Sequence, residues 1–78
     1  MDEIILPYDT ITLVAINTKH VIQNTMGDGN DILYASRHGD ASKAWLELYQ
    51  GDSLTVDSDI YLLQKTNWEN VVIPLVGI

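Results

Sequence analysis

The sequence predicts an all-β fold: a small, single-domain antiparallel β-sandwich or jelly-roll-like barrel of about seven short strands. Short runs rich in Ile, Val, Leu and Tyr recur along the chain, separated by clusters of Gly, Asn, Asp and Ser. No segment sustains the 3.6-residue spacing of an amphipathic helix. The 78 residues form one predicted domain over residues 1–78, since no linker, repeat or low-complexity tract divides them.

The first part of the chain is predicted to contain an arm and three strands. Residues 1–8 form a short apolar arm, for which a place in a subunit interface is one interpretation. Residues 11–16 are apolar in both phases, which indicates a strand covered on both faces, inside the sandwich or in a subunit interface. A half-polar strand over 20–25 and a strand over 32–36 follow.

Residues 45–56 are predicted to form a β-hairpin. Leu46 and Leu48 share one phase before the turn at 50–52, as Leu54 and Val56 do after it. We expect Gly51 to supply the positive φ that a tight turn often needs. A short helix over 42–48 is the alternative, but alternating aromatic residues suit a pleated surface better.

Two further strands, over 60–65 and 71–76, complete the predicted fold. Pro74 lies in the second of them, and proline cannot donate a hydrogen bond to a strand ladder. The sequence therefore predicts that this last strand is an edge strand or carries a bulge.

The charge balance argues against two classes of partner. Eleven acidic residues oppose four basic ones, and the four cations are scattered, so we expect no nucleic-acid surface. An anionic membrane is disfavoured for the same reason, and no apolar run approaches the roughly 20 residues that span a bilayer. The acidic start of the chain is unlike a secretory signal, and cysteine is absent, so cytoplasmic folding is predicted.

The small size of the chain predicts self-association. A 78-residue domain buries a modest share of its surface, and neither a disulfide nor a Cys/His zinc cluster is available to stabilise it. With 46% of residues apolar, some apolar side chains should remain for a neighbouring copy. The predicted interface residues lie near the two ends: Ile4, Ile5, Leu6, Trp68, Val72, Leu75, Val76 and Ile78. The competing interpretation of the C-terminal run is a closing core strand of the same chain.

Several segments, in order, resemble small β-sandwich proteins encoded among the virion genes of tailed phages. These are residues 22–25, 32–36, the run from Leu48 through Gly51 to Thr55, residues 60–62 and the closing valine-rich strand. Gln50 stands where a proline often precedes the glycine, and the apolar N-terminal arm is unusually long. The resemblance implies a non-enzymatic, oligomeric virion component of decoration, spike or tail-associated type. A trimer and a location in the virion are part of that implication.

Residues 27–31 are the best candidate for a metal site. The run Gly-Asp-Gly-Asn-Asp is similar to one copy of the calcium-binding nonapeptide of β-rolls, and Asp28, Asn30 and Asp31 would supply oxygen ligands. A β-roll builds each site from neighbouring turns, and this chain has no second copy. A plain turn is therefore the preferred interpretation, and no cofactor is predicted.

Residues 36–40 place a serine, a histidine and an aspartate close together without suggesting an enzyme. Members of a catalytic triad meet through the fold, and no nucleophile elbow accompanies Ser36, His38 and Asp40. His20 is interpreted as a strand residue on a polar face. We predict no catalytic residues.

Two roles are considered for the aromatic side chains. Apart from Tyr8 in the N-terminal arm, the aromatic residues are Tyr34, Trp45, Tyr49, Tyr61 and Trp68. Because the chain has no phenylalanine, packing in the core is the preferred role for them. The alternative is an exposed patch that binds a partner or a carbohydrate. The sequence thus predicts a structural or interaction module, with a calcium- or carbohydrate-binding module as the alternative.

Overall fold

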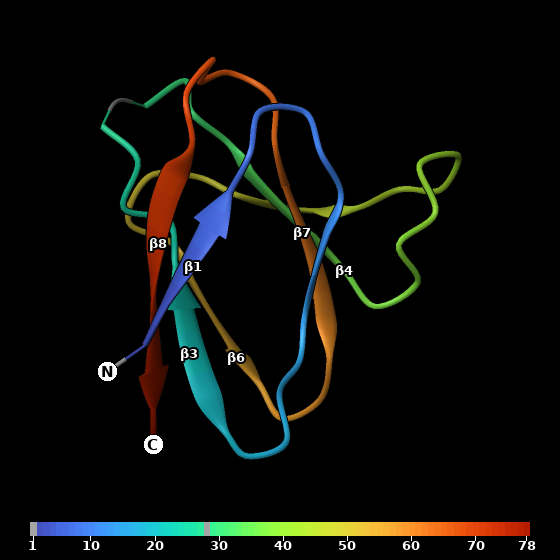
Figure 1. Ribbon diagram of the computed structural model, residues 1–78, viewed down its shortest axis with the longest axis vertical. Helices are drawn as coiled ribbons and strands as arrows, with labels where there is room; N and C mark the ends of the chain where they lie inside the picture. The colour runs from blue at the N-terminus through green and yellow to red at the C-terminus, as the bar shows by residue number, and fades with distance from the viewer. Residues whose placement is uncertain (1, 28) are drawn as a thin grey trace.

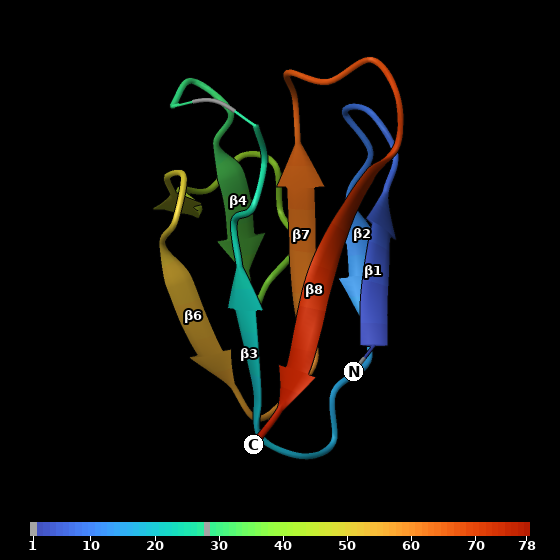
Figure 2. The ribbon, with the colours of Figure 1, turned by 90° about the vertical axis from the view of Figure 1, so that its left-hand side faces the viewer.

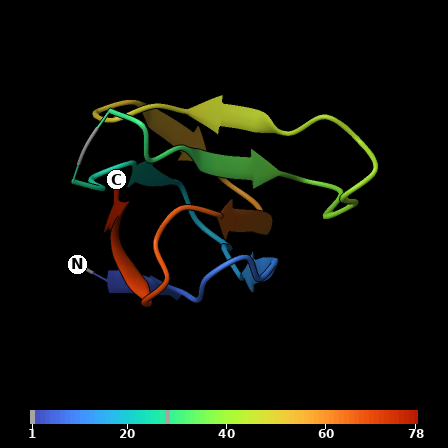
Figure 3. The same cartoon turned by 90° about the horizontal axis from the view of Figure 1, so that it is seen from above.

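The computed structural model describes residues 2–27 and 29–78, which fold into two four-stranded antiparallel sheets packed face to face. Sheet A has the strand order β1-β8-β3-β6, and sheet B has the order β2-β7-β4-β5. Figure 2 looks onto the outer face of sheet A, and Figure 3 shows the two sheets side by side from above. The strands are β1 (Asp2–Leu6), β2 (Thr12–Val14), β3 (His20–Gln23), β4 (Leu33–Ser36), β5 (Leu46–Leu48), β6 (Ser53–Val56), β7 (Ile60–Gln64) and β8 (Val71–Gly77). The predicted all-β sandwich is confirmed.

The core lies between the sheets and is almost entirely aliphatic. Alternation along β8 buries Val71, Ile73 and Leu75 and turns Val72 and Val76 outward, as a period of two requires. The other buried apolar residues between the sheets are Ile4, Leu6, Val14, Ile16, Ile22, Met26, Leu33, Ala35, Leu48, Val56, Ile60 and Leu62.

The prediction that the aromatic residues pack in the core is therefore wrong. Tyr34 and Tyr61 are half-buried on the outer face of sheet B, whereas Tyr49 and Trp68 are exposed. Trp45 is half-buried just before β5. Aliphatic residues occupy the inner faces of both sheets, which lie about 10 Å apart in a sandwich.

The N-terminal arm is a strand of the sandwich. Residues 2–6 form β1, which lies beside β8 in Figure 1 and pairs with it. This strand places Ile4 and Leu6 in the core. The other seven strands match the predicted ones in position, so the described residues form eight strands in all. Of the two alternatives for residues 11–16, a place covered on both faces inside the sandwich is wrong, because β2 has Val14 buried and Leu13 exposed. Cover by a second subunit stays a prediction.

The predicted hairpin over residues 45–56 is also wrong. β5 pairs with β4 in sheet B, whereas β6 pairs with β3 in sheet A, so the turn between them passes from one sheet to the other. The turn itself is where the sequence places it: the Asp52 N–H donates to the Tyr49 carbonyl over 2.9 Å, and Gly51 has a φ of 87°. Every connection except that between β4 and β5 crosses between the sheets.

Pro74 does not mark an edge strand, since β8 lies between β1 and β3. The β1–β8 ladder runs without interruption through the pair Glu3 and Pro74, so the proline nitrogen must face β3. Pairing between β3 and β8 stops one residue away, at Ile22 and Leu75. The missing N–H therefore lies where that ladder has already ended.

Candidate functional site

An apolar stripe runs along the outer face of sheet A. We call it the β8 stripe; it consists of Ile5, Val21, Val72, Pro74 and Val76. Ile5 pairs with Val72, and Val21 pairs with Val76, so the side chains of each pair are direct cross-strand neighbours. Ile5, Val72 and Val76 are 58%, 49% and 42% exposed. The stripe thus crosses three adjacent strands of sheet A, β1, β8 and β3 (Figure 2).

The surroundings of the β8 stripe carry little charge. The outward residues of β3 and β6 beside it are Gln23, Ser53 and Thr55, all uncharged. Glu3, which pairs with Pro74, brings a carboxylate to the β1 side. For a chain of net charge −7, this face is one where a second acidic molecule can approach with little electrostatic repulsion.

The other predicted interface residues fall into two groups. Ile4, Leu6 and Leu75 are buried in the core of the chain itself, so they are not available at its surface. Trp68 and Ile78 are exposed. The interface prediction therefore remains a prediction for the outward residues, and the structure places the inward ones in the intrachain core.

Trp68 lies on the loop between β7 and β8, where its indole stacks on the Tyr8 ring. The ring centroids are 4.6 Å apart and the planes differ by 21°. The Trp68 side chain nevertheless remains 81% exposed. The pair forms an aromatic platform that Tyr8 holds in place; the two rings are far apart in the sequence, which carries no signal of this contact.

Two of the candidate calcium ligands, Asn30 and Asp31, lie on the loop between β3 and β4. Asp28 lies outside the described residues. Asp31 Oδ1 accepts a hydrogen bond from the Thr66 hydroxyl over 2.6 Å, which ties this loop to the loop after β7. Over residues 2–27 and 29–78, no group of three or more His, Asp or Glu side chains is placed to hold a metal ion.

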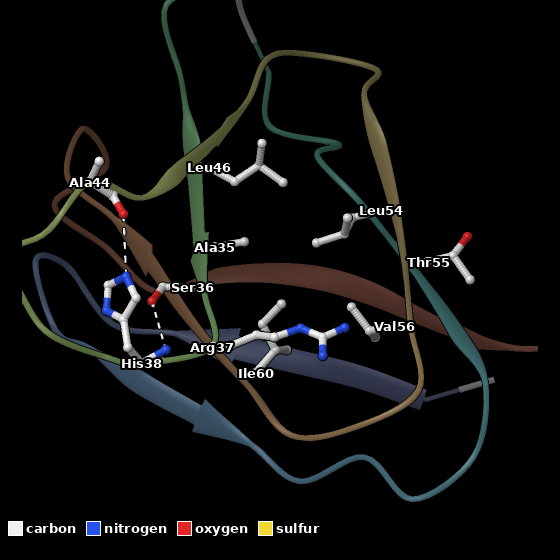
Figure 4. A pocket seen from close by; sticks show the side chains of 10 residues that line it. All are labelled: Ala35, Ser36, Arg37, His38, Ala44, Leu46, Leu54, Thr55, Val56 and Ile60. Atoms are coloured by element: carbon white, nitrogen blue, oxygen red, sulfur yellow. Dashed lines mark hydrogen bonds between the residues drawn. The ribbon is translucent and has the colours of Figure 1, made fainter.

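Ser36 ends β4, and residues 37–40 begin the loop that follows it; the side chains of this segment bind neighbouring residues of the same segment. Ser36 Oγ accepts the N–H groups of His38 and Gly39, and His38 Nδ1 accepts the N–H of Asp40 (Figure 4 draws the bond between Ser36 and His38). The Asp40 carboxylate accepts the hydroxyl and the N–H of Ser42, which lowers the pKa of Asp40 below its usual value. This geometry is that of a loop ordered by its own hydrogen bonds.

Two fully buried polar side chains, Asn24 and Gln64, were not singled out from the sequence. Asn24 Nδ2 donates to the carbonyls of Asp31 and Leu48, and its Oδ1 accepts the N–H of Met26. Gln64 makes comparable bonds to the loop that follows β7. Asn24 follows β3 and Gln64 is the last residue of β7. Polar residues are common at the ends of strands, so nothing in the sequence distinguishes these two as buried.

No protein family model, curated protein or solved structure matches the chain. The described residues also contain no helix of the length and apolar character needed to cross a membrane.

Proposed function

We propose that this protein is a non-enzymatic structural module whose copies associate through the β8 stripe. The observation that carries the proposal is the row of exposed aliphatic side chains on a sheet face that bears little charge. Exposed Ile and Val side chains in neighbouring positions gain free energy when a second apolar surface covers them, about 25 cal/mol per Å². The resemblance to small phage virion proteins supports a decoration, spike or tail-associated role in the virion.

The geometry favours a two-fold pair. When two copies place the same sheet face together, the contact is isologous and closes after two subunits. A trimer, which the phage resemblance implies, needs two different patches on each copy. Light scattering on the purified protein separates these two states by mass, since one chain has a mass of 8.7 kDa.

Replacing Val76 with aspartate is expected to dissociate the assembly. The substitution places a carboxylate from each copy in an apolar contact, and an unpaired buried charge costs about 3 kcal/mol or more, equivalent to roughly 100-fold in Kd. The mass measured by light scattering at about 10 μM should fall to that of one chain, and Val72→Asp should act alike. Deleting β1 would be a poor test, because Ile4 and Leu6 fill the core.

Leu13→Asp is the matched control for this experiment. Leu13 is 53% exposed, like the stripe residues, but it lies on β2 of the other sheet. This variant should keep the parental mass. A wild type that is a monomer, or dissociation by Leu13→Asp as complete as by Val76→Asp, would refute association through the β8 stripe.

For the virion role, the expected result is many copies of the chain in mass spectra of washed phage particles.

A second candidate function, carbohydrate binding, is favoured by the platform of Tyr8 and Trp68. Indole faces that are open to solvent stack well against the apolar face of a sugar ring. Because Trp68 is 81% exposed, an oligosaccharide that binds there should change its fluorescence. In a screen of oligosaccharides, Trp68→Ala should abolish a saturable fluorescence or calorimetric response while Trp45→Phe preserves it. No response from the wild type to any glycan would refute this candidate.

A further inference from the structure

A cleft opens between the two sheets along the edges of β5 and β6. Its volume is about 260 Å³. The apolar part of its lining comes from both sheets and from the loop before β5, and it consists of Ala35, Ala44, Leu46, Leu54, Val56 and Ile60 (Figure 4). β5 and β6 are the outermost strands of their sheets and are joined by the turn over residues 49–52, so no described strand covers the opening between their free edges.

The apolar wall of the cleft is partly open to solvent. Leu46 is half-exposed and Leu54 is half-buried, although both belong to strands whose neighbouring inward residues, Leu48 and Val56, are buried. Ala35 contributes a small side chain opposite them, which leaves space where a larger residue would fill it. An apolar molecule that entered the cleft would therefore remove accessible aliphatic surface from water.

Arg37 places a positive charge at the mouth of this cleft. Arg37 comes directly after β4, and its side chain crosses the opening beside Val56 and Ile60 (Figure 4). The guanidinium lies 3.9 Å from an Asp57 carboxylate oxygen, and both side chains are 71% exposed, so the pair is long and solvent-screened. The guanidinium thus keeps donors for a second anion, and guanidinium groups match carboxylates well.

We propose that this cleft binds a small aliphatic carboxylate, with the hydrocarbon chain between the sheets and the carboxylate on Arg37. One water occupies about 30 Å³ in the liquid, so the volume suits a ligand of roughly eight or nine non-hydrogen atoms. Hexanoate is a probe of that size. The cleft opens between the sheets, whereas the β8 stripe lies on the outer face of sheet A; the two approach each other at Thr55, which lines the cleft and pairs with Val21 of the stripe.

The first test is a titration of the ¹⁵N-labelled protein with sodium hexanoate, followed by NMR. The amide signals of Ala35, Leu46, Leu54 and Val56 should shift saturably, with a Kd of about 1 mM for a ligand of this size. Hexan-1-ol, which lacks the charge, should bind at the same signals about threefold to fivefold more weakly. Acetate, which lacks the hydrocarbon chain, should give no saturable shift there.

Variants then separate the two parts of the site. Arg37→Gln should weaken hexanoate binding about threefold to fivefold and leave hexan-1-ol unchanged. Lys65→Gln is the control: Lys65 lies over the Tyr34 ring and not at the cleft, so its replacement should change the affinity for neither ligand. Leu46→Ser should abolish the shifts, whereas Leu13→Ser, at a comparably exposed leucine, should not. Asp57→Asn removes a competing carboxylate and should strengthen hexanoate binding about twofold.

Three results would overturn the proposal. Equal affinities for hexanoate and hexan-1-ol would show that Arg37 recognises no carboxylate. The absence of saturable shifts at the cleft would show that no aliphatic ligand of this size enters. Shifts of the cleft signals with protein concentration alone would show that a second copy of the chain occupies it.

Discussion

Replacing Asn24 with alanine is expected to lower the free energy of unfolding by about 3–5 kcal/mol, because each buried polar group left without a partner costs about 1–3 kcal/mol. The side chain is fully buried and donates to the carbonyls of Asp31 and Leu48 over 2.7 and 2.8 Å. Its oxygen accepts the N–H of Met26 over 2.9 Å. Alanine would remove the side-chain partner of all three backbone groups.

The loss is large for a domain of this size, whose total stability should be about 4–12 kcal/mol at the usual value per residue. Urea unfolding at fixed protein concentration, followed by circular dichroism, measures it as a lower midpoint. The matched control is Asn17→Ala, at an exposed asparagine, which should change the stability by less than about 0.5 kcal/mol. Equal midpoints for the two variants would show that Asn24 does not organise this end of the sandwich.

The all-β class and the position of seven strands could be predicted, because alternation and turn residues are local signals. The pairing of the strands could not be predicted from these local signals. Residues Leu46, Leu48, Leu54 and Val56 show the same alternation whether their strands lie side by side or face each other across the core. A tight turn at Gly51 serves either arrangement, and the pairing is decided by distant partners such as Leu33 and Ile22.

The candidate site could be predicted in part for the same reason. The excess of apolar residues near the chain ends predicts a surface role for Ile5, Val72 and Val76, and these side chains do lie outward. Their neighbours Ile4 and Leu75 were assigned with them but point inward, since the phase of each strand depends on which face meets the other sheet. The cleft beside Arg37 arises from the spacing of two sheet edges, for which the sequence has no local signal.

The second polar side chain that the sequence does not mark, Gln64, organises the loop between β7 and β8. Its Nε2 donates to the Asn67 carbonyl over 2.9 Å and to the carbonyls of Leu6 and Glu69 over 3.4 Å each. Its Oε1 accepts the N–H groups of Asn67 and Thr66 over 2.9 and 3.3 Å. One fully buried amide thus holds the loop that carries the aromatic platform against the end of β1.

Replacing Gln64 with leucine is therefore expected to destabilise the protein by about 2–4 kcal/mol, since the closest partners would be buried without hydrogen bonds. Leucine is close to glutamine in size, so a cavity would not account for the loss. Gln23→Leu is the matched control: Gln23 is exposed and donates to the Gly51 carbonyl over 3.1 Å, and its replacement should cost less than about 1 kcal/mol. Urea midpoints measure both variants, and amide exchange over residues 65–70 should accelerate in Gln64→Leu alone. If the loop exchanges at the parental rate in that variant, contacts other than the buried amide hold it.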